Sequence, residues 1–356
     1  MADSTPTNTQ TLHATLPLQA AGRRLDAVLA EQFSGFSRSQ IQQWIKSGKV
    51  VLDGLAVLKP NHKVLGGERV ELTAEFKPQV HFAPQPVPLE IVHEDEEILV
   101  INKAAGQVVH PGAGNPDGTL LNGLLYHAPD LEKLPRAGIV HRLDKETTGL
   151  MVVAKTPRAQ NSLIEQLSKR TVERVYDALV QGELIAGGTV EKNIGRHPKD
   201  RKRMAALDVG GKPAVTHYRV HERFRGFTHV RCKLETGRTH QIRVHMALIG
   251  HPLLGDPVYG GRLRIPKGMA PAIIEQLRAF RRQALHAGRL SFIHPATGQT
   301  VTFSAPIPDD MAFVIDLLRD DLDLSQVGEA AFDEWDYDEG VDVAWVTDDG
   351  QMLEWE

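Results

Sequence analysis

The sequence predicts a mixed α/β fold, because short strand-like segments and short helix-like segments follow one another along the chain. Residues 150–154 form an apolar, partly β-branched run with the length of a buried strand. Residues 228–235 alternate instead, which places Val230, Cys232 and Leu234 on one inward face. With 356 residues, 41% of them hydrophobic, the chain is long enough for two compact domains with their own cores.

The first domain is expected to span residues 16–77. Residues 1–15 are polar and lack an apolar period, so they are predicted to be a disordered tail, with order beginning at the next residue. A helix is expected over residues 22–29. Strands are expected over residues 49–54 and 65–72, because each is an apolar run beside a glycine turn.

A second helix is expected within this first domain. Ser37 is a suitable N-cap, and Gln40 three residues later completes a capping box. Ile41, Trp44 and Ile45 then follow the i, i+3, i+4 spacing of an apolar helix face. We expect this face to be buried.

Residues 77–88 contain four prolines and are predicted to form a semi-rigid extended linker. We therefore place the linker at residues 78–88 and a larger second domain at residues 89–320. The second domain is expected to open with two strands, over residues 90–97 and 98–103.

A glycine-rich loop at residues 109–118 comes next. It lacks the Gly-Lys-Ser/Thr ending of a nucleotide-phosphate loop, so a plain surface loop near an active site is expected. A helix is then expected to begin at Thr156, with Leu163, Ile164 and Leu167 on its apolar face.

The charged residues are distributed unevenly. Residues 321–356, an acidic tail, hold 13 of the 45 Asp and Glu residues and no Lys or Arg, so residues 1–320 carry 41 basic against 32 acidic residues, a net charge of +9. The body of the chain is therefore basic enough to approach a polyanion. The acidic tail either folds over this basic surface or is solvated without a role.

The composition argues against several classes of protein. No segment approaches the roughly 18–20 apolar residues that a membrane span needs. The first ten residues have neither the basic region nor the apolar run of a secretory signal. Cys232 is the one cysteine, which permits no internal disulfide and no thiolate metal cluster and fits a reducing compartment. We expect a cytoplasmic protein with no membrane partner.

Residues 141–156 carry the strongest chemical signal. Asp144 lies between Arg142 and Lys145, just before the predicted strand. Nearby cations lower the pKa of a carboxyl group, and an ionised carboxylate suits a nucleophile better than a general acid. An exposed turn with a local ion pair is the alternative explanation for so short a string.

Residues 236–260 form a second block. Thr239 can cap a helix that Gly250 ends. His240 and His245 suggest a metal at first sight, but residues five apart do not share one helical face. No carboxylate or cysteine joins them at ligand spacing, so no metal site is expected.

Residues 141–156, 174–182 and 236–260 together resemble the RNA pseudouridine synthases, a family that isomerises uridine in ribosomal and transfer RNA. The resemblance covers about residues 89–308, and residues 16–77 resemble an S4-type RNA-binding module. It implies a mixed, mainly antiparallel sheet around a central cleft, with the small RNA-binding domain in front. The order of these parts along the chain resembles the order in the family members that modify 23S large-subunit ribosomal RNA.

The resemblance also implies roles for individual residues. Asp144 is the expected nucleophile, attacking either the sugar C1′ or the uracil ring. Tyr176 is expected to stack against the base and help remove the C5 proton. Arg243 is expected to pair with Asp144, and we prefer it to Arg238 because a position inside a helix is fixed by packing. No cofactor is expected, because the isomerisation is redox-neutral and uses no phosphoryl donor.

The chemistry requires the target uridine to leave its stack, which costs on the order of a few kcal/mol. Arg142 is placed to fill the space that the base leaves or to hold its phosphate. Residues 196–203 are strongly basic and either contact RNA phosphates or lie in solvent. Further RNA contacts are expected from basic side chains beside the nucleophile and on the S4-like module, namely His141, Lys145, Arg238, Arg23, Arg24, Arg38, Lys46 and Lys49.

Other functions remain open at this point. A catalytically idle RNA-binding factor for ribosome assembly is one, and the same chemistry on transfer RNA is another. The presence of Asp144, Tyr176 and Arg243 together argues against an idle protein, since binding alone needs only a basic surface. A metal-dependent nuclease would need clustered carboxylates, which the sequence lacks. We expect a monomer that binds large-subunit RNA or an assembling subunit.

Overall fold

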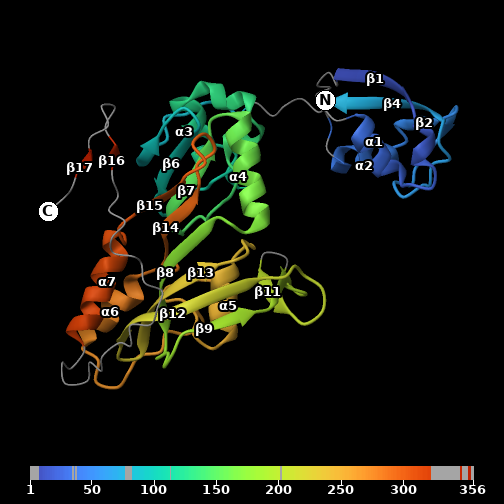
Figure 1. The fold of residues 1–356 in the computed structure, drawn as a ribbon. Coiled ribbons are helices and arrows are strands. Elements are labelled where there is room, and N and C mark those ends of the chain that lie inside the picture. The colour runs from blue at the N-terminus through green and yellow to red at the C-terminus, as the bar shows by residue number, and fades with distance from the viewer. Residues whose placement is uncertain are drawn as a thin grey trace, which may run out of the picture. The chain divides into compact units, whose positions relative to one another are not determined.

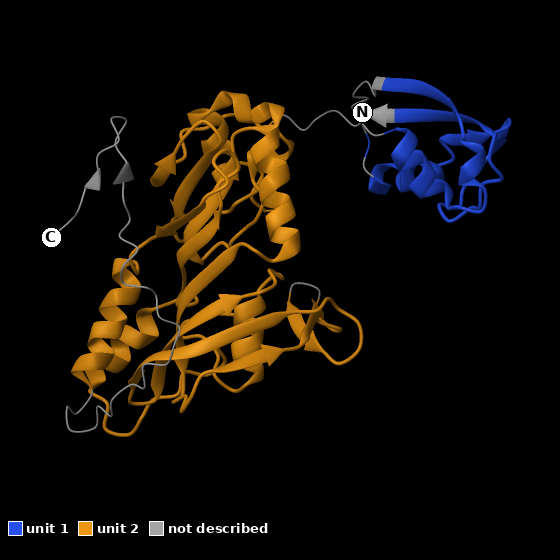
Figure 2. Cartoon of the chain, viewed as in Figure 1, with its two compact units in different colours: residues 1–81 blue, residues 82–356 orange. Residues whose placement is uncertain are grey.

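The computed structural model describes residues 8–33, 36, 38–76, 82–112, 114–200, 203–321, 345–346 and 352–353. The chain divides into two compact units, residues 1–81 and residues 82–356 (Figure 2). Among the described residues, the helices are too short or too polar to cross a membrane.

Unit 1 is a four-stranded antiparallel sheet that shares one core with two helices. The strand order is β1-β4-β2-β3. The predicted helix face is buried, with Ile41 and Ile45 fully enclosed and Trp44 nearly so, whereas Ser37 lies outside the described residues. In chain order the elements are β1 (Asn8–Thr15), α1 (Leu25–Gln32), α2 (Arg38–Lys46), β2 (Val50–Leu52), β3 (Leu55–Ala56) and β4 (Arg69–Phe76).

The expectation that residues 1–15 are disordered is wrong for residues 8–15, which form β1. Every residue of this strand pairs with a residue of β4. Leu12 and Ala14 are half-buried and Leu16 is buried, a short alternation that marks the inward face. The strand gains its backbone partners from a segment more than 50 residues further along the chain, so local polarity gave no sign of it.

Unit 2 is built on a nine-stranded sheet with the order β5-β6-β7-β14-β8-β13-β12-β9, in which β15 also pairs with β14 (Figure 1). The strands pair antiparallel except for β7 and β14, which run parallel. The strands of this sheet are β5 (Ile91–Glu94), β6 (Ile98–Lys103), β7 (Thr148–Ala154), β8 (Glu173–Gln181), β9 (Gly188–Glu191), β12 (Val215–Phe224), β13 (Phe227–Leu234), β14 (Leu285–Ile293) and β15 (Thr300–Ser304).

Helices and two small hairpins complete unit 2. The hairpins are β10–β11 and, within the acidic segment, β16–β17. Helix α7 was not expected from the sequence. These elements are α3 (Leu120–His127), α4 (Pro157–Lys169), β10 (Asn193–Arg196), β11 (Met204–Leu207), α5 (Gln241–Leu248), α6 (Pro271–Ala279), α7 (Asp309–Asp320), β16 (Trp345–Val346) and β17 (Met352–Leu353).

Strand β7 is buried along its whole length, as its apolar run predicts. Met151 and Val153 face one core, which includes α3, and Leu150 and Val152 face another, which includes α4. A strand covered on both faces needs apolar residues at every position, which explains the continuous run. The residues just before β7, including Asp144, are thereby tied to the centre of the sheet.

Two predictions about helix α4 and helix α5 are wrong in detail. Ile164 is 49% exposed, and Gln166 is buried in the same helix because its side-chain amide hydrogen-bonds the backbone N–H and carbonyl of Ile293. Thr239 does not cap α5. The cap is His240, which has a left-handed backbone and makes no side-chain capping bond.

The parallel contact between β7 and β14 depends on Gly149. Its φ is +114°, and a Cβ built there would lie 2.4 Å from the carbonyl oxygen of Ala287 and 2.5 Å from its nitrogen. These are backbone atoms of the neighbouring strand, so they cannot turn aside. Only glycine allows the two strands to approach this closely.

We expect Gly149→Ala to lower the free energy of unfolding of unit 2 by roughly 2–6 kcal/mol, from overpacking and backbone strain together. Gly106→Ala is the matched control, because Gly106 has a φ of +77° but nothing within 4 Å of its Cβ position. This control variant introduces only backbone strain, so its free energy of unfolding should fall by about 1–2 kcal/mol. Urea unfolding followed by circular dichroism measures both, and equal losses would show that the β7–β14 contact is not tight.

Candidate active site

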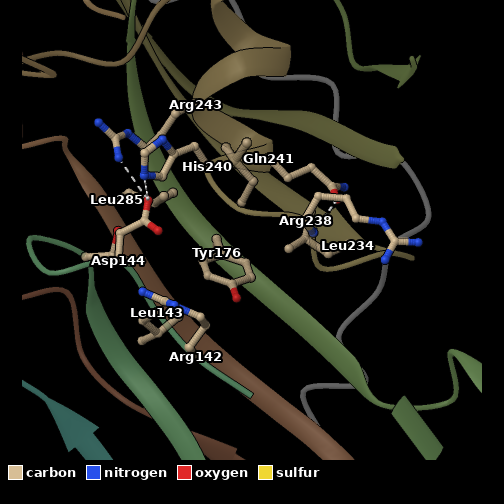
Figure 3. Close-up of a pocket in the computed structure, with 12 residues that line it drawn as sticks. Arg142, Leu143, Asp144, Tyr176, Leu234, Arg238, His240, Gln241, Arg243 and Leu285 are labelled. Atoms are coloured by element: carbon tan, nitrogen blue, oxygen red, sulfur yellow. Dashed lines mark hydrogen bonds and ion pairs between the residues drawn. The ribbon is translucent and has the colours of Figure 1, made fainter. Parts of the chain in front are cut away.

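Three segments that are distant in sequence meet at one pocket of unit 2 (Figure 3). Asp144 comes from the segment before β7, Tyr176 from β8 and Arg243 from α5. The pocket is open to solvent, and its empty space, open solvent included, is about 350 Å³. It is lined by Arg142, Leu143, Asp144, Thr147, Tyr176, Leu234, Arg238, His240, Gln241, Ile242, Arg243 and Leu285.

Arg243 is held by two carboxylates. Its Nε and Nη2 donate to Asp256 at 2.7 and 2.9 Å, and its Nη1 donates to Oδ2 of Asp144 at 2.9 Å. Asp256 is fully buried and also accepts the backbone N–H groups of Val258 and Tyr259. The two-pronged bond to Asp256 fixes the guanidinium plane, so the third nitrogen has one direction in which to point.

At neutral pH, Arg243 is positively charged and Asp256 is negatively charged. Burial alone would lower the pKa of Arg243, but hydrogen bonds and the charge of Asp256 outweigh it and raise that pKa above its ordinary value. Burial alone would raise the pKa of Asp256, but bonds from Arg243 lower it. A positive guanidinium therefore always faces Asp144.

Asp144 uses its two oxygens differently. Oδ2 accepts from Arg243 and lies 3.8 Å from Nε2 of His240. Oδ1 has no hydrogen-bond partner within the described part of the chain, and Figure 3 shows it on the side of the pocket where Tyr176 lies. The cation bonded to Asp144 is Arg243, 99 residues away, which is the pairing that the family resemblance implied, and not the sequence neighbours Arg142 and Lys145.

Tyr176 forms a wall of the pocket and is also part of the hydrophobic core, with only 7% of its surface exposed. Burial raises the pKa of Tyr176 above its usual value, so the hydroxyl keeps its proton at neutral pH. The ring offers a flat apolar face beside Asp144.

Other expected residues near the pocket lie in several environments. Arg142 is exposed at the pocket, whereas Arg238 points away from Asp144 and donates through Nε to the carbonyl of Pro213 (Figure 3). His141 accepts the N–H of Val152 at Nε2, and burial lowers the pKa of His141 to about 3, so its ring is neutral. His141 therefore holds the Asp144 segment against β7.

The sequence analysis did not assign Asp256 or Lys103 to this site, and it did not predict that His240 lines the pocket. Lys103 is 1% exposed and donates to the carbonyls of Ala104, Gln107 and Lys145, and burial lowers its pKa to about 8. It ties the end of β6 to the segment that carries Asp144. A lysine at the end of an otherwise apolar strand was the one available signal.

The structure places His240 and His245 in different environments. His240 faces the pocket, whereas His245 bonds the hydroxyl of Thr216 and the carbonyl of Lys192. Across the described ranges, no three His, Cys, Asp or Glu side chains are grouped so that they could hold a metal ion.

In unit 1, two of the arginines that were expected to contact RNA bind the same buried carboxylate. Asp26 is fully enclosed and accepts from Arg24 at 3.0 Å and from Arg38 at 3.1 Å, while both arginine side chains remain about half exposed. Arg23 pairs separately with Glu31, and Lys46 is exposed at the end of α2. Asp26 thus holds two cationic side chains in fixed positions at the surface of the unit.

Asp26 also makes the stability of unit 1 depend on pH. Hydrogen bonds from Arg24 hold the pKa of Asp26 well below its usual range, against the effect of burial. The stabilisation is therefore complete above the unfolded carboxyl pKa of about 4 and is lost as the pH falls below it.

We expect Asp26→Asn to lower the free energy of unfolding of unit 1 by about 1–2 kcal/mol at pH 7, and the difference from wild type to shrink below about pH 4. Glu31→Gln, at an exposed ion pair, should have no measurable effect. Urea unfolding of the full chain at pH 7 and pH 3 measures this. A loss that is the same at both pH values would contradict the proposed charge effect.

Comparison with known proteins identifies the family. The family model described as RNA pseudouridylate synthase matches residues 97–248, and the model described as S4 domain matches residues 23–70. The "Ribosomal large subunit pseudouridine synthase D" of Xanthomonas campestris pv. campestris is 54% identical over 89% of this chain and 96% of its own length. The protein of that name from Escherichia coli K12 is 55% identical over 88% of this chain and 95% of its own length.

A solved structure agrees with these relatives. "Human RNA Pseudouridylate Synthase Domain Containing 4" is 27% identical and covers 65% of this chain and 93% of its own, with a TM-score of 0.51. The expected mixed α/β fold with an N-terminal S4 domain is confirmed. The chain belongs to the RNA pseudouridylate synthase family, with an S4 domain at its N-terminal end.

Proposed function

We propose that this protein isomerises uridine to pseudouridine in large-subunit ribosomal RNA, with Asp144 as the nucleophile. The observation that carries the proposal is the Asp144 carboxylate bonded at one oxygen by a buried arginine and open to the pocket at the other. The names of the relatives at 54–55% identity support ribosomal RNA as the substrate.

The proposed reaction balances without any added reagent. A free oxygen of Asp144 attacks either C1′ of the sugar or the uracil ring, and the bond between N1 and C1′ breaks with its electron pair passing to the base. The base rotates, C5 bonds to C1′, and the carboxylate is released. The proton of C5 is lost and N1 gains one, so that substrate and product are isomers. Arg243 keeps the carboxylate oriented throughout.

Tyr176 is proposed to receive the flipped base on its ring. Because burial raises the pKa of its hydroxyl, Tyr176 stays protonated at neutral pH and little phenolate is present to take up the C5 proton, which favours stacking. Stacking against an aromatic ring is worth about 1–3 kcal/mol per base, which offsets part of the cost of flipping.

The remaining RNA contacts are proposed to be electrostatic. Arg142 at the pocket is suited to the backbone of the flipped nucleotide. Arg24 and Arg38 of the S4 domain are suited to phosphates elsewhere on the RNA. The protein would act as a monomer in the cytoplasm, where ribosomal subunits assemble. An idle binding protein would have no need of a buried Asp256–Arg243 pair, because burying charges costs free energy that RNA affinity does not recover.

We expect that Asp144→Asn abolishes the reaction, with a loss of roughly 10³-fold or more, because an amide is not a nucleophile here. The measurement is a pseudouridine map of ribosomal and transfer RNA from cells that lack the gene and express wild-type protein, Asp144→Asn or Asp208→Asn. Asp208 is an exposed aspartate paired with Lys192, so its variant should restore every site.

The outcomes of this experiment separate the candidates. If large-subunit sites are lost on deletion, and wild type and Asp208→Asn restore them but Asp144→Asn does not, both the reaction and the nucleophile are supported. Loss of transfer RNA sites alone would keep the reaction and change the substrate. Persistence of every site in the deleted strain would overturn the proposed activity in favour of an RNA-binding role.

A further inference from the structure

His240 occupies an unusual position beside Asp144. It directly precedes α5 with φ 57° and ψ 23°, a left-handed conformation that few residues other than glycine adopt. Its side chain is 20% exposed and lines the pocket. Strained residues of this kind persist where their surroundings determine them, and they concentrate at functional sites.

Two contacts fix the ring of His240. Nδ1 lies 2.8 Å from the hydroxyl of Tyr259, and Nε2 lies 3.8 Å from Oδ2 of Asp144. Tyr259 is itself held: its backbone N–H donates to Asp256 and its ring lies 5.1 Å from the guanidinium of Arg243. Tyr259 therefore contacts both basic groups that face Asp144.

The hydrogen bonds of Tyr259 favour one of the two neutral tautomers of His240. The backbone N–H of Met204 donates to the Tyr259 hydroxyl at 2.9 Å, and an amide cannot accept in return. The hydroxyl proton is left for Nδ1 of His240, the one other partner of this hydroxyl in the part of the chain that the structure describes. Burial lowers the pKa of His240, so the ring is neutral. A neutral ring that accepts at Nδ1 has its proton on Nε2.

We propose that Tyr259 holds His240 as the Nε2–H tautomer, and that His240 is a second hydrogen-bond donor to Oδ2 of Asp144 during the isomerisation. This inference rests on the proposed function and extends it. The separation of 3.8 Å is longer than a hydrogen bond, so the ring and the carboxylate have to approach by about 1 Å when RNA binds.

A second donor on Oδ2 has a defined chemical use. Whether Asp144 has attacked C1′ or the uracil ring, its bond to the substrate must finally break, and the electron pair of that bond returns to the carboxylate. Donors placed where that negative charge develops stabilise the transition state. With Arg243 and His240 both on Oδ2, Oδ1 is left to form and break the bond to the substrate. His240 would touch the reacting group, whereas Tyr259 would act through His240 as a positioning residue.

The tautomer can be measured without any activity. In protein labelled with ring-¹⁵N histidine, the His240 signals are those missing from His240→Gln. We expect wild type to show a protonated Nε2 and an unprotonated Nδ1, and Tyr259→Phe to show a mixture of the two tautomers. A wild-type ring with its proton on Nδ1 would overturn the inference.

Single-turnover pseudouridine formation on bound large-subunit RNA tests the donor itself. We expect His240→Phe to lower the rate about 10–100-fold, less than the loss of a whole oxyanion hole donor because Arg243 remains. His240→Gln, whose amide N–H₂ lies near the position of Nε2, should recover most of the rate, and Tyr259→Phe should lose about 3–10-fold. RNA affinity should change less than about 3-fold in all three. His127→Gln, at an exposed pair with Glu94, should match wild type.

The conservative variant distinguishes donation from packing. If His240→Gln and His240→Phe are equally slow while both remain folded, the ring acts by packing and the inference fails. If wild type forms no pseudouridine, the proposed function fails, and the ¹⁵N spectra still decide the tautomer of His240 independently.

Discussion

The buried ion pair between Asp256 and Arg243 is the interaction on which the pocket depends. Asp256 is fully enclosed and accepts four hydrogen bonds, two from Arg243 and two from the backbone of Val258 and Tyr259. An enclosed charge is tolerated only when it is paired and hydrogen-bonded in this way. The same carboxylate thereby fixes the guanidinium that faces Asp144 and the turn that places Tyr259 beside His240.

The sheet supplies the frame for this pair. The close parallel contact of β7 and β14 fixes the strand that follows Asp144, and Gly149 makes that contact possible. Lys103 ties the Asp144 segment to the end of β6, and Gln283 ties it to the segment before β14 through the hydroxyl of Thr147. The nucleophile's position is therefore set by several chain segments, which suits a reaction that tolerates little misplacement.

Periodicity in the sequence predicted the burial patterns that a segment's own residues determine. It did not predict the features that depend on residues distant in the chain. The runs that became β7 and β13 carry their burial pattern in their own residues. Strand β1, by contrast, exists because of β4, and Gln166 is buried because the backbone of a distant strand satisfies its side-chain amide. At the site, family resemblance selected Asp144, Tyr176 and Arg243, but Asp256 and His240 gain their roles from neighbours brought together by folding.

Single-turnover kinetics of Asp256→Asn test the central claim most directly. We expect the rate of pseudouridine formation to fall at least about 100-fold while RNA affinity stays within about 3-fold, because Arg243 loses the partner that aims it. Arg243→Lys, which keeps the charge but not the fork, should behave similarly, and circular dichroism establishes that each variant is folded. A folded Asp256→Asn protein that reacts at the wild-type rate would show that the Asp256–Arg243 pair does not position Asp144.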